Sequence, residues 1–379
     1  MKAKRRGLTA NASRTPTVRR IKPAITPARP KSAATRVSPG SVVSALSAAP
    51  SASIDALGGR PVAMEVDLGR GLVFVNPVIV ASGPFGYGVE VADAVDLARL
   101  GGIVTRSTTL KARSGNAGRR TAEVPAGVLL GMGLQNPGIE SVIERYAPTW
   151  AKWTTPVIVS LAGESASDLA SAARQMEGLP GVAGIELNLS CGNASRGGLA
   201  FALDADSAAS AVSAVRRATD LPLIAKLTAA AGDIRAVARA VEAAGADAIA
   251  AINTLPGLAL AADRAGPELG SGYGGLSGPA LRPIALRAVY EIAQVVEVPV
   301  IGIGGIATIE DVLDLLAAGA SAVGVGIAAL ADPMLPVRLA DELADACRAR
   351  GKASVADLVG TALPRKAGPP STRGAEYAR

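Results

Sequence analysis

Histidine is absent from the sequence, and cysteine occurs only twice, at Cys191 and Cys347. Without histidine a Ser-His-Asp triad is excluded, and Cys, Lys, Asp, Glu or Tyr must supply any general acid or base. Two cysteines without a CxxC pair provide neither a disulfide framework nor the ligands of common zinc or iron-sulfur sites. These absences predict a cytoplasmic protein that binds no metal of its own.

Acidic residues are nearly missing from residues 1–60, which hold twelve Lys or Arg and one acid, Asp55. The whole chain has 39 basic and 32 acidic side chains, so residues 61–379 hold 27 and 31. The net charge of +7 therefore comes from the first segment. The rest of the chain lacks the general positive charge that binding to nucleic acid requires.

Residues 1–60 also lack a sustained apolar period and are rich in Ala, Ser, Pro, Thr and Arg. Such a composition does not repay the entropy of ordering, so we expect a disordered extension. Three interpretations are open, namely an extension without function or a mis-assigned start, an interaction tail, and a targeting segment. Translation from Met64, which opens the first strand-like pattern, would remove the segment. We expect the folded body at residues 61–362 and a flexible tail at 363–379.

Apolar runs are short, and none reaches the roughly 18 residues of a membrane helix. From residue 77 onward, β-branched or apolar runs alternate with Ala-rich helical stretches, the pattern of parallel strands joined by crossover helices. A doubly wound sheet would place a Gly-rich dinucleotide turn after its first strand, where Ala81-Ser82-Gly83-Pro84 stands instead. The sequence therefore predicts an α/β protein, a (β/α)₈ TIM barrel. Its eight strands are expected at 77–81, 102–106, 156–161, 183–189, 222–227, 247–253, 299–303 and 321–325.

Glycines cluster where the predicted seventh and eighth strands end, at Gly302-Ile-Gly304-Gly305 and Val323-Gly-Val-Gly326. This end of the strands carries the active site of a (β/α)₈ barrel, and glycine lets backbone N–H groups approach a phosphate. Close packing is the alternative reason for such glycines. Two glycine motifs at these two strands favour a phosphorylated cofactor or substrate.

The fourth predicted strand ends in Ile185-Glu-Leu-Asn188-Leu-Ser-Cys191-Gly-Asn193, which places amides and a thiol on the expected active-site rim. With four further motifs, this segment resembles the class 1 dihydroorotate dehydrogenases over residues 64–350. The sequence from Gly274 to Leu286 resembles class 1B in particular. The further motifs are Asn76-Pro77 to Ser82-Gly83, Gly133-Leu-Gln-Asn-Pro-Gly138, Ala251-Ile-Asn253-Thr254 and Gly274-Gly-Leu-Ser-Gly278-Pro-Ala280.

The resemblance implies oxidation of (S)-dihydroorotate to orotate in pyrimidine synthesis, with one FMN per chain. Cys191 matches the base that removes the C5 proton while the C6 hydride passes to N5 of FMN, a role that requires a thiolate. A buried structural cysteine is the alternative role. Class 1B further implies an electron-transfer subunit that carries FAD and a [2Fe-2S] cluster and reduces NAD⁺, with two chains of each kind. Cys347 lies in a late predicted helix and is expected to pack.

The resemblance also implies which residues bind FMN and which bind the pyrimidine. Lys226 matches a lysine that contacts FMN, where a cation stabilises negative charge on the reduced flavin; its alternative role is a structural ion pair. Each matching amide offers the donor and the acceptor that a pyrimidine ring requires. The FMN positions are Ser82, Arg106, Ser107, Ser160, Asn188, Lys226, Ile252, Gly278, Gly304, Gly305, Gly326 and Ile327. The substrate positions are Arg106, Leu130, Gly131, Met132, Gly133, Leu134, Asn188, Asn193, Asn253 and Thr254.

Four residues depart from the family pattern. Arg106 replaces a lysine that touches flavin and substrate, Leu130 and Ser160 replace asparagines, and Gly192 replaces a proline. The departures leave open a flavin enzyme that acts on another dihydropyrimidine. A barrel that binds a phosphorylated ligand without catalysis, docked through its basic tail to nucleic acid or an anionic surface, is the third hypothesis.

Overall fold

The computed structural model describes residues 61–190, 192–193 and 199–364. The predicted extension at residues 1–60, the predicted base Cys191 and residues 365–379 lie outside this part. In the part that the structure describes, no helix is long and apolar enough to cross a membrane.

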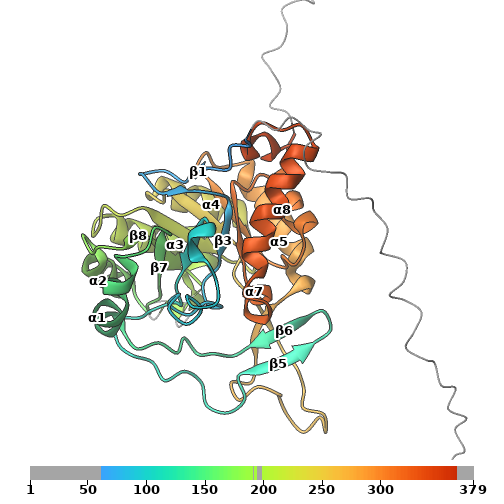
Figure 1. The fold of residues 1–379 in the computed structure, drawn as a ribbon. Helices are drawn as coiled ribbons and strands as arrows, with labels where there is room; N and C mark the ends of the chain where they lie inside the picture. Colours follow the sequence, from blue (N-terminus) through green and yellow to red (C-terminus); the bar gives the residue numbers. More distant parts are fainter. Residues whose placement is uncertain (1–60, 191, 194–198, 365–379) are drawn as a thin grey trace, which may run out of the picture. The chain divides into compact units, whose positions relative to one another are not determined.

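Eight parallel strands close into a barrel in the order β11-β12-β15-β16-β3-β4-β7-β8 (Figure 1). Each of these strands overlaps one of the predicted runs, so the predicted (β/α)₈ barrel is confirmed. Their residues are almost entirely buried, because inner side chains fill the barrel and outer ones face helices. The barrel strands are β3 (Val78–Val80), β4 (Gly102–Val104), β7 (Val157–Leu161), β8 (Val182–Asn188), β11 (Leu223–Leu227), β12 (Ala248–Ala251), β15 (Val300–Ile303) and β16 (Ala322–Val325).

Helices fill six of the seven connections between consecutive barrel strands, and two further helices follow β16. Between β3 and β4 the described chain has instead the 3₁₀ turn η2 (Leu97–Arg99). Small residues let the helices approach the strands closely: α2 buries Leu169, Ala172, Ala173 and Met176 at helical spacing. The helices are α1 (Ile139–Trp150), α2 (Ala166–Met176), α3 (Ala205–Arg216), α4 (Ile234–Ala243), α5 (Arg282–Ala293), α6 (Ile309–Ala317), α7 (Ile327–Ala331) and α8 (Leu335–Ala349), with the 3₁₀ turns η4 (Phe201–Leu203), η5 (Pro279–Leu281) and η6 (Val355–Leu358).

A second sheet, which the sequence did not predict, combines two long connections. The strands β5 (Thr121–Val124) and β6 (Gly127–Leu130) belong to the connection after β4, and the hairpin that they form projects from the barrel (Figure 1). The strands β13 (Leu255–Gly257) and β14 (Gly274–Ser277) belong to the connection after β12. The four pair in the antiparallel order β13-β14-β6-β5. Because both connections leave the carboxyl ends of barrel strands, this sheet lies on the side where the active site is expected.

Two smaller hairpins lie at opposite ends of the barrel. β1 (Val66–Asp67) pairs with β2 (Val73–Phe74), and Arg70 in their turn forms an ion pair with Asp247, which directly precedes β12. That hairpin therefore covers the amino end of the strands. β9 (Gly192–Asn193) pairs with β10 (Leu199–Ala200) in the connection after β8, at the carboxyl end.

Cys347 is fully buried on α8, so the prediction that it packs is confirmed. Burial raises the pKa of its thiol. A protonated, inaccessible thiol is a poor nucleophile.

An aromatic cluster fastens α1 to the connection after β3. The rings of Tyr87 and Tyr146 stack with centroids 4.3 Å apart, and Trp150 donates its indole N–H to the Tyr87 carbonyl at 2.9 Å. The Tyr87 hydroxyl lies 3.2 Å from the Thr108 hydroxyl. Burial raises the pKa of Tyr87 to about 12.

The Tyr87 pKa predicts an alkaline loss of stability. Between pH 10 and pH 12 the unfolded chain releases this proton and the folded chain retains it, so the free energy of unfolding falls as pH rises. The shift corresponds to a contribution on the order of 2 to 3 kcal/mol that is complete below pH 10. Urea unfolding of wild type and Tyr87→Phe from pH 8 to pH 11.5 should show a shallower decline in the variant. Parallel declines would contradict this account.

Candidate active site

Polar side chains from five neighbouring barrel strands meet at the carboxyl end. Ser82 follows β3 and Ser107 follows β4, whereas Ser160 lies in β7 and Lys226 in β11. Asn188 ends β8 and pairs in register with Lys226. Barrel closure thus gathers predicted cofactor residues that are more than 140 positions apart in the sequence.

Ser107 is the centre of this polar network. Its Oγ lies 3.0 Å from Ser160 Oγ and 3.5 Å from Ser82 Oγ, and it accepts a hydrogen bond from Asn188 Nδ2 at 3.0 Å. Ser107 and Ser160 are buried, with 7% and 0% exposure, so these contacts replace hydration that the hydroxyls lose. The network connects the predicted flavin residues with the predicted pyrimidine residues.

Asn188 and Asn253 orient each other's side-chain amides. Asn253 Nδ2 donates to Asn188 Oδ1 at 3.0 Å, and Asn253 Oδ1 accepts from the Thr254 N–H at 2.7 Å. Asn188 Oδ1 also accepts from the Ser190 N–H at 3.2 Å, at the start of the segment that carries Cys191. The amides are half-buried, so part of each remains accessible to a ligand.

A buried ion pair completes the network, and one of its two residues, Glu186, was not predicted from the sequence. Lys226 Nζ lies 3.5 Å from Glu186 Oε1, and Glu186 accepts a hydrogen bond from Ser160 Oγ at 3.1 Å. The lysine and glutamate side chains are only 6% and 1% exposed. The alternative ion-pair role of Lys226 is therefore present in the structure. Glu186 stands two residues before Asn188, so strand alternation, which places them on one face, was the signal that could have found it.

Hydrogen bonds to its backbone hold Arg106 in place, and its guanidinium remains available to a ligand. Its N–H donates to the Gly86 carbonyl at 2.7 Å, and its carbonyl accepts from the hydroxyls of Thr105 and Thr108, each at 3.2 Å. Within the described residues, no hydrogen bond or ion pair is formed by its half-buried guanidinium. A ligand with a carboxylate or carbonyl could therefore bind it.

The predicted phosphate glycines differ in what surrounds them. Gly304 and Gly305 adopt φ values of 137° and 76°, and a Cβ on Gly305 would lie 2.6 Å from the Arg282 nitrogen. Nothing lies within 4 Å of the position that a Cβ on Gly326 would take. Ile252, which is buried, and Gly278, with φ of 106°, follow β12 and β14, and Ile327 begins α7.

The donor set fits FMN. Backbone N–H groups beside crowded glycines suit a phosphate. Buried hydroxyls, amides and an ammonium suit the donors and acceptors along the edge of a flavin ring.

The remaining substrate positions lie at the end of one strand of the second sheet and in the loop that follows it. Leu130 ends β6, where it pairs with Gly275 of β14, and a Cβ on Gly275 would collide with the Thr254 side chain. The sheet thus connects Leu130 to the segment that carries Asn253 and Thr254. Gly131, Met132, Gly133 and Leu134 form the loop that follows, with positive φ at Gly133 and Leu134.

Asn136 anchors this loop, a role that was not predicted from the sequence. Its Oδ1 accepts from the N–H groups of Thr109 and Gly138 at 3.2 and 2.9 Å. Its Nδ2 donates to the Thr109 hydroxyl and the Leu134 carbonyl at 2.9 and 2.7 Å. All four hydrogen-bonding positions of the buried amide are therefore used, and they fix the loop to Thr109, near the start of the same connection.

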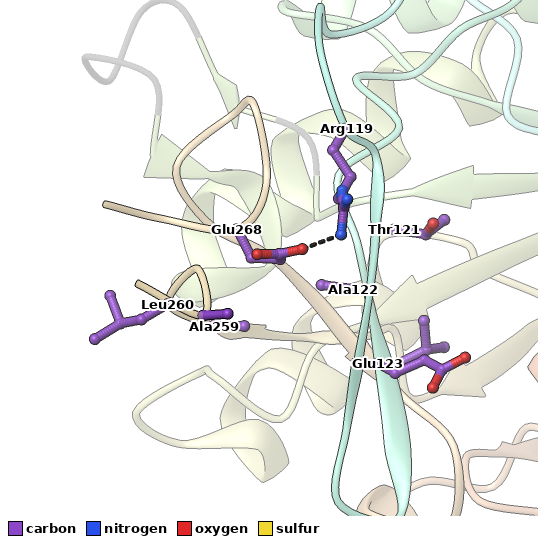
Figure 2. Close-up of a pocket in the computed structure, with 9 residues that line it drawn as sticks. Arg119, Thr121, Ala122, Glu123, Ala259, Leu260 and Glu268 are labelled. Carbon is purple, nitrogen blue, oxygen red and sulfur yellow. Dashed lines mark hydrogen bonds and ion pairs between the residues drawn. The ribbon is translucent and has the colours of Figure 1, made fainter. Parts of the chain in front are cut away.

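A cavity of about 630 Å³ lies beside the second sheet and contains none of the predicted site residues. Figure 2 shows Arg119 directed at Glu268 across it, and the two form an ion pair. β5 contributes Thr121, Ala122 and Glu123, and the connection after β13 contributes Ala259 and Leu260. The predicted site is instead the polar network at the strand ends.

A (β/α)₈ barrel with this network at its carboxyl end is a scaffold for a flavin oxidoreductase. A profile of the family described as dihydroorotate dehydrogenase matches residues 67–347. The chain belongs to the dihydroorotate dehydrogenase family.

The curated relatives point to one branch of that family. A catalytic subunit of dihydroorotate dehydrogenase B (NAD⁺) from Porphyromonas gingivalis is 46% identical over 297 residues, which cover 78% of this chain and 97% of the relative. The corresponding subunit from Desulforudis audaxviator is 46% identical and covers 77% and 95%, and that from Bacillus pumilus is 42% identical and covers 76% and 94%. The resemblance to class 1B is confirmed.

The role of Cys191 stays a prediction because the residue lies outside the described part of the chain. Asn193 is described only as backbone, within the β9–β10 hairpin. The hairpin does place Asn193 in the connection that follows Asn188 at the end of β8.

The four hydrogen bonds of Asn136 predict a large effect of a small substitution. Asn136→Ala leaves buried N–H groups of Thr109 and Gly138 without acceptors, which should lower the free energy of unfolding by about 2 to 4 kcal/mol. Amide hydrogen exchange at residues 131–138 should accelerate as well. The neighbouring exposed residue provides the control, since Gln135→Ala should change stability by less than about 1 kcal/mol. Equal effects of the two substitutions would argue against the anchor.

Proposed function

We propose that this protein oxidises (S)-dihydroorotate to orotate in pyrimidine synthesis, with FMN as the first electron acceptor. The observation that carries the proposal is the network of Ser107, Asn188, Lys226 and Asn253 at the carboxyl end of a barrel of this family. Membership of the family by itself indicates only the reaction for which the relatives are named. The network supplies groups that can perform it here.

The cofactor would lie across the barrel mouth. Backbone groups at Gly304, Gly305 and Gly326 would hold its phosphate, and Ser82, Ser107, Ser160, Asn188 and Lys226 would surround the ring, with Arg106, Ile252, Gly278 and Ile327 completing the site. When bound, FMN would accept the hydride that leaves C6 of dihydroorotate.

Cys191 would remove the proton from C5 of the substrate. Asn188 holds the start of the segment that carries it, through the hydrogen bond from the Ser190 N–H. The Ser190 hydroxyl is buried and has no partner among the described residues, so an acceptor or donor from a ligand or from the adjoining segment would satisfy it. Loss of the C5 proton to the thiolate and of the C6 hydride leaves the C5=C6 double bond of orotate.

The pyrimidine ring would be held by neutral amides and one cation. Asn188 and Asn253, with Asn193, would pair with the N–H and C=O groups of the ring, and Thr254 would support Asn253. Arg106 would contact both the flavin and the anionic substrate, because its guanidinium is not used within the described structure. The loop Gly131–Leu134 would cover the substrate, with Leu130 providing an apolar contact.

Electrons would leave the flavin through a second polypeptide. The relatives are named catalytic subunits of an NAD⁺ enzyme, and that name implies a partner subunit. We infer an electron-transfer subunit with FAD and a [2Fe-2S] cluster, in an assembly of two chains of each kind. The present chain has two cysteines and no histidine, too few ligands for such a cluster. We place the complex in the cytoplasm, with residues 61–362 as its catalytic barrel and residues 1–60 and 363–379 outside it.

A second substrate class is favoured by one observation. Leu130 offers no hydrogen bond where relatives of this class would place an amide, and one unpaired polar group weakens binding by about 1 to 3 kcal/mol. Another dihydropyrimidine, such as dihydrouracil, would then be the better substrate of the same chemistry.

Anaerobic mixing with dihydroorotate tests the proposal directly. The oxidised flavin should lose its absorbance near 450 nm, and Cys191→Ser should slow this step by about 10² to 10⁴-fold because a general base contributes rates of that size. Cys347→Ser is the matched control and should react like wild type. Faster reduction of the flavin by dihydrouracil than by dihydroorotate would favour the second substrate. A protein without flavin would refute both proposals.

Arg106 is expected to contribute to catalysis through its charge. Arg106→Met should reduce kcat/KM for dihydroorotate by roughly 10- to 100-fold, the effect of losing one charge-assisted hydrogen bond. Arg113→Met removes an exposed arginine that pairs with Glu164, and it should change kcat/KM less than about threefold. Similar losses in the two variants would mean that Arg106 has no specific role at the site.

A further inference from the structure

We infer that Glu186 is a positioning residue that holds Lys226 and offsets its charge, and thereby sets the reduction potential of the flavin. The inference rests on the proposed function, because it takes FMN to bind beside Lys226. Glu186 is not among the flavin-binding residues expected from the sequence.

The geometry places Glu186 between two predicted flavin residues. It lies 3.5 Å from Lys226 Nζ and accepts from Ser160 Oγ at 3.1 Å, and it pairs in register with Ser160 across β7 and β8. Ser160 itself touches Ser107, which bonds Asn188. A movement of the glutamate would therefore disturb both the lysine and the hydroxyl network.

The ion pair leaves the lysine with unused donors. An ammonium has three N–H groups. At 3.5 Å, Glu186 balances the charge of Lys226 without a short direct hydrogen bond, and no other acidic partner of Lys226 exists among the described residues. Buried donors are rarely left unpaired, so the remaining N–H groups are available for a bound ring.

Stability alone does not account for the pair. Removing two charges from water is unfavourable, and well-packed apolar residues often replace a buried ion pair without loss of stability. A barrel interior is otherwise filled by branched apolar side chains, as at Ile158 and Ile224 here. The charges are therefore explained better by an effect on a ligand.

Removal of Glu186 and removal of Lys226 should shift the reduction potential of the flavin in opposite directions. Reduction adds negative charge to a flavin, and charges act strongly over short distances in a buried site. Without the carboxylate, Lys226 is uncompensated and favours the reduced form. Without the lysine, Glu186 is uncompensated and disfavours it. Loss of both charges largely restores the original balance.

The test measures the flavin midpoint potential of the full-length, FMN-loaded protein against reference dyes under chemical or enzymatic reduction without dihydroorotate. We expect Glu186→Gln to favour reduced over oxidised flavin at least tenfold, a rise of about 30 mV for two electrons. Lys226→Met should change the ratio in the opposite direction by a similar factor, and the double variant should lie between the single variants.

Two controls separate this effect from general damage. Asp345→Asn removes an exposed acid paired with Arg348 on α8 and should change the ratio less than twofold. Ser160→Ala keeps both charges but removes the hydrogen bond to Glu186, so its change should be smaller than that of Glu186→Gln. If Glu186→Gln alone does not fold, the double variant is compared with Lys226→Met, and its potential should be the higher of the two.

The outcomes distinguish this inference from the proposed function. A change of less than twofold in Glu186→Gln, or shifts of the same sign in both single variants, would overturn the inference with the flavin still bound. If the potentials shift as expected but dihydroorotate does not reduce the flavin, the inference is supported and the proposed substrate is contradicted. A wild-type protein that binds no flavin would overturn both.

Discussion

Closure of the eight-stranded barrel is the constraint on which the site depends. Parallel strands that close on themselves bring their carboxyl ends to one rim, so single residues from β4, β7, β8 and β11 can share one polar network. Most side chains beneath that rim are apolar and buried. Every polar group there must find a partner inside the protein, which ties serine, asparagine, glutamate and lysine into mutually dependent positions. Position in the barrel, more than any single side chain, makes them a site.

The barrel could be predicted from the sequence because its strands are short apolar runs at regular intervals. All eight were located, and the glycines after β15 and β16 predict by position alone which end would bind a phosphate. The family resemblance, confirmed by the profile match over residues 67–347, is the basis for expecting a flavin and a pyrimidine substrate. Local patterns were sufficient where each strand is buried on both faces.

Other features depended on contacts between distant segments, which local patterns do not contain. The second sheet pairs β6 with β14, whose sequences are about 145 positions apart and rich in glycine. A (β/α)₈ barrel predicts a helix between β3 and β4, but the described chain there has the 3₁₀ turn η2. Glu186 could not be recognised from the residues at strand ends, because this acid lies inside β8. The described residues do not test Cys191, whose role therefore remains a prediction.

The second sheet also joins two connections that would otherwise be independent. Leu130 and its loop come from the connection after β4, and Thr254 comes from the connection after β12, yet β6 and β14 hydrogen-bond them into one unit. In evolution, an insertion or deletion in one connection must preserve the register of the other. The lengths of these two segments should therefore vary together among relatives, so that this part of the proposed substrate site is inherited as a single module.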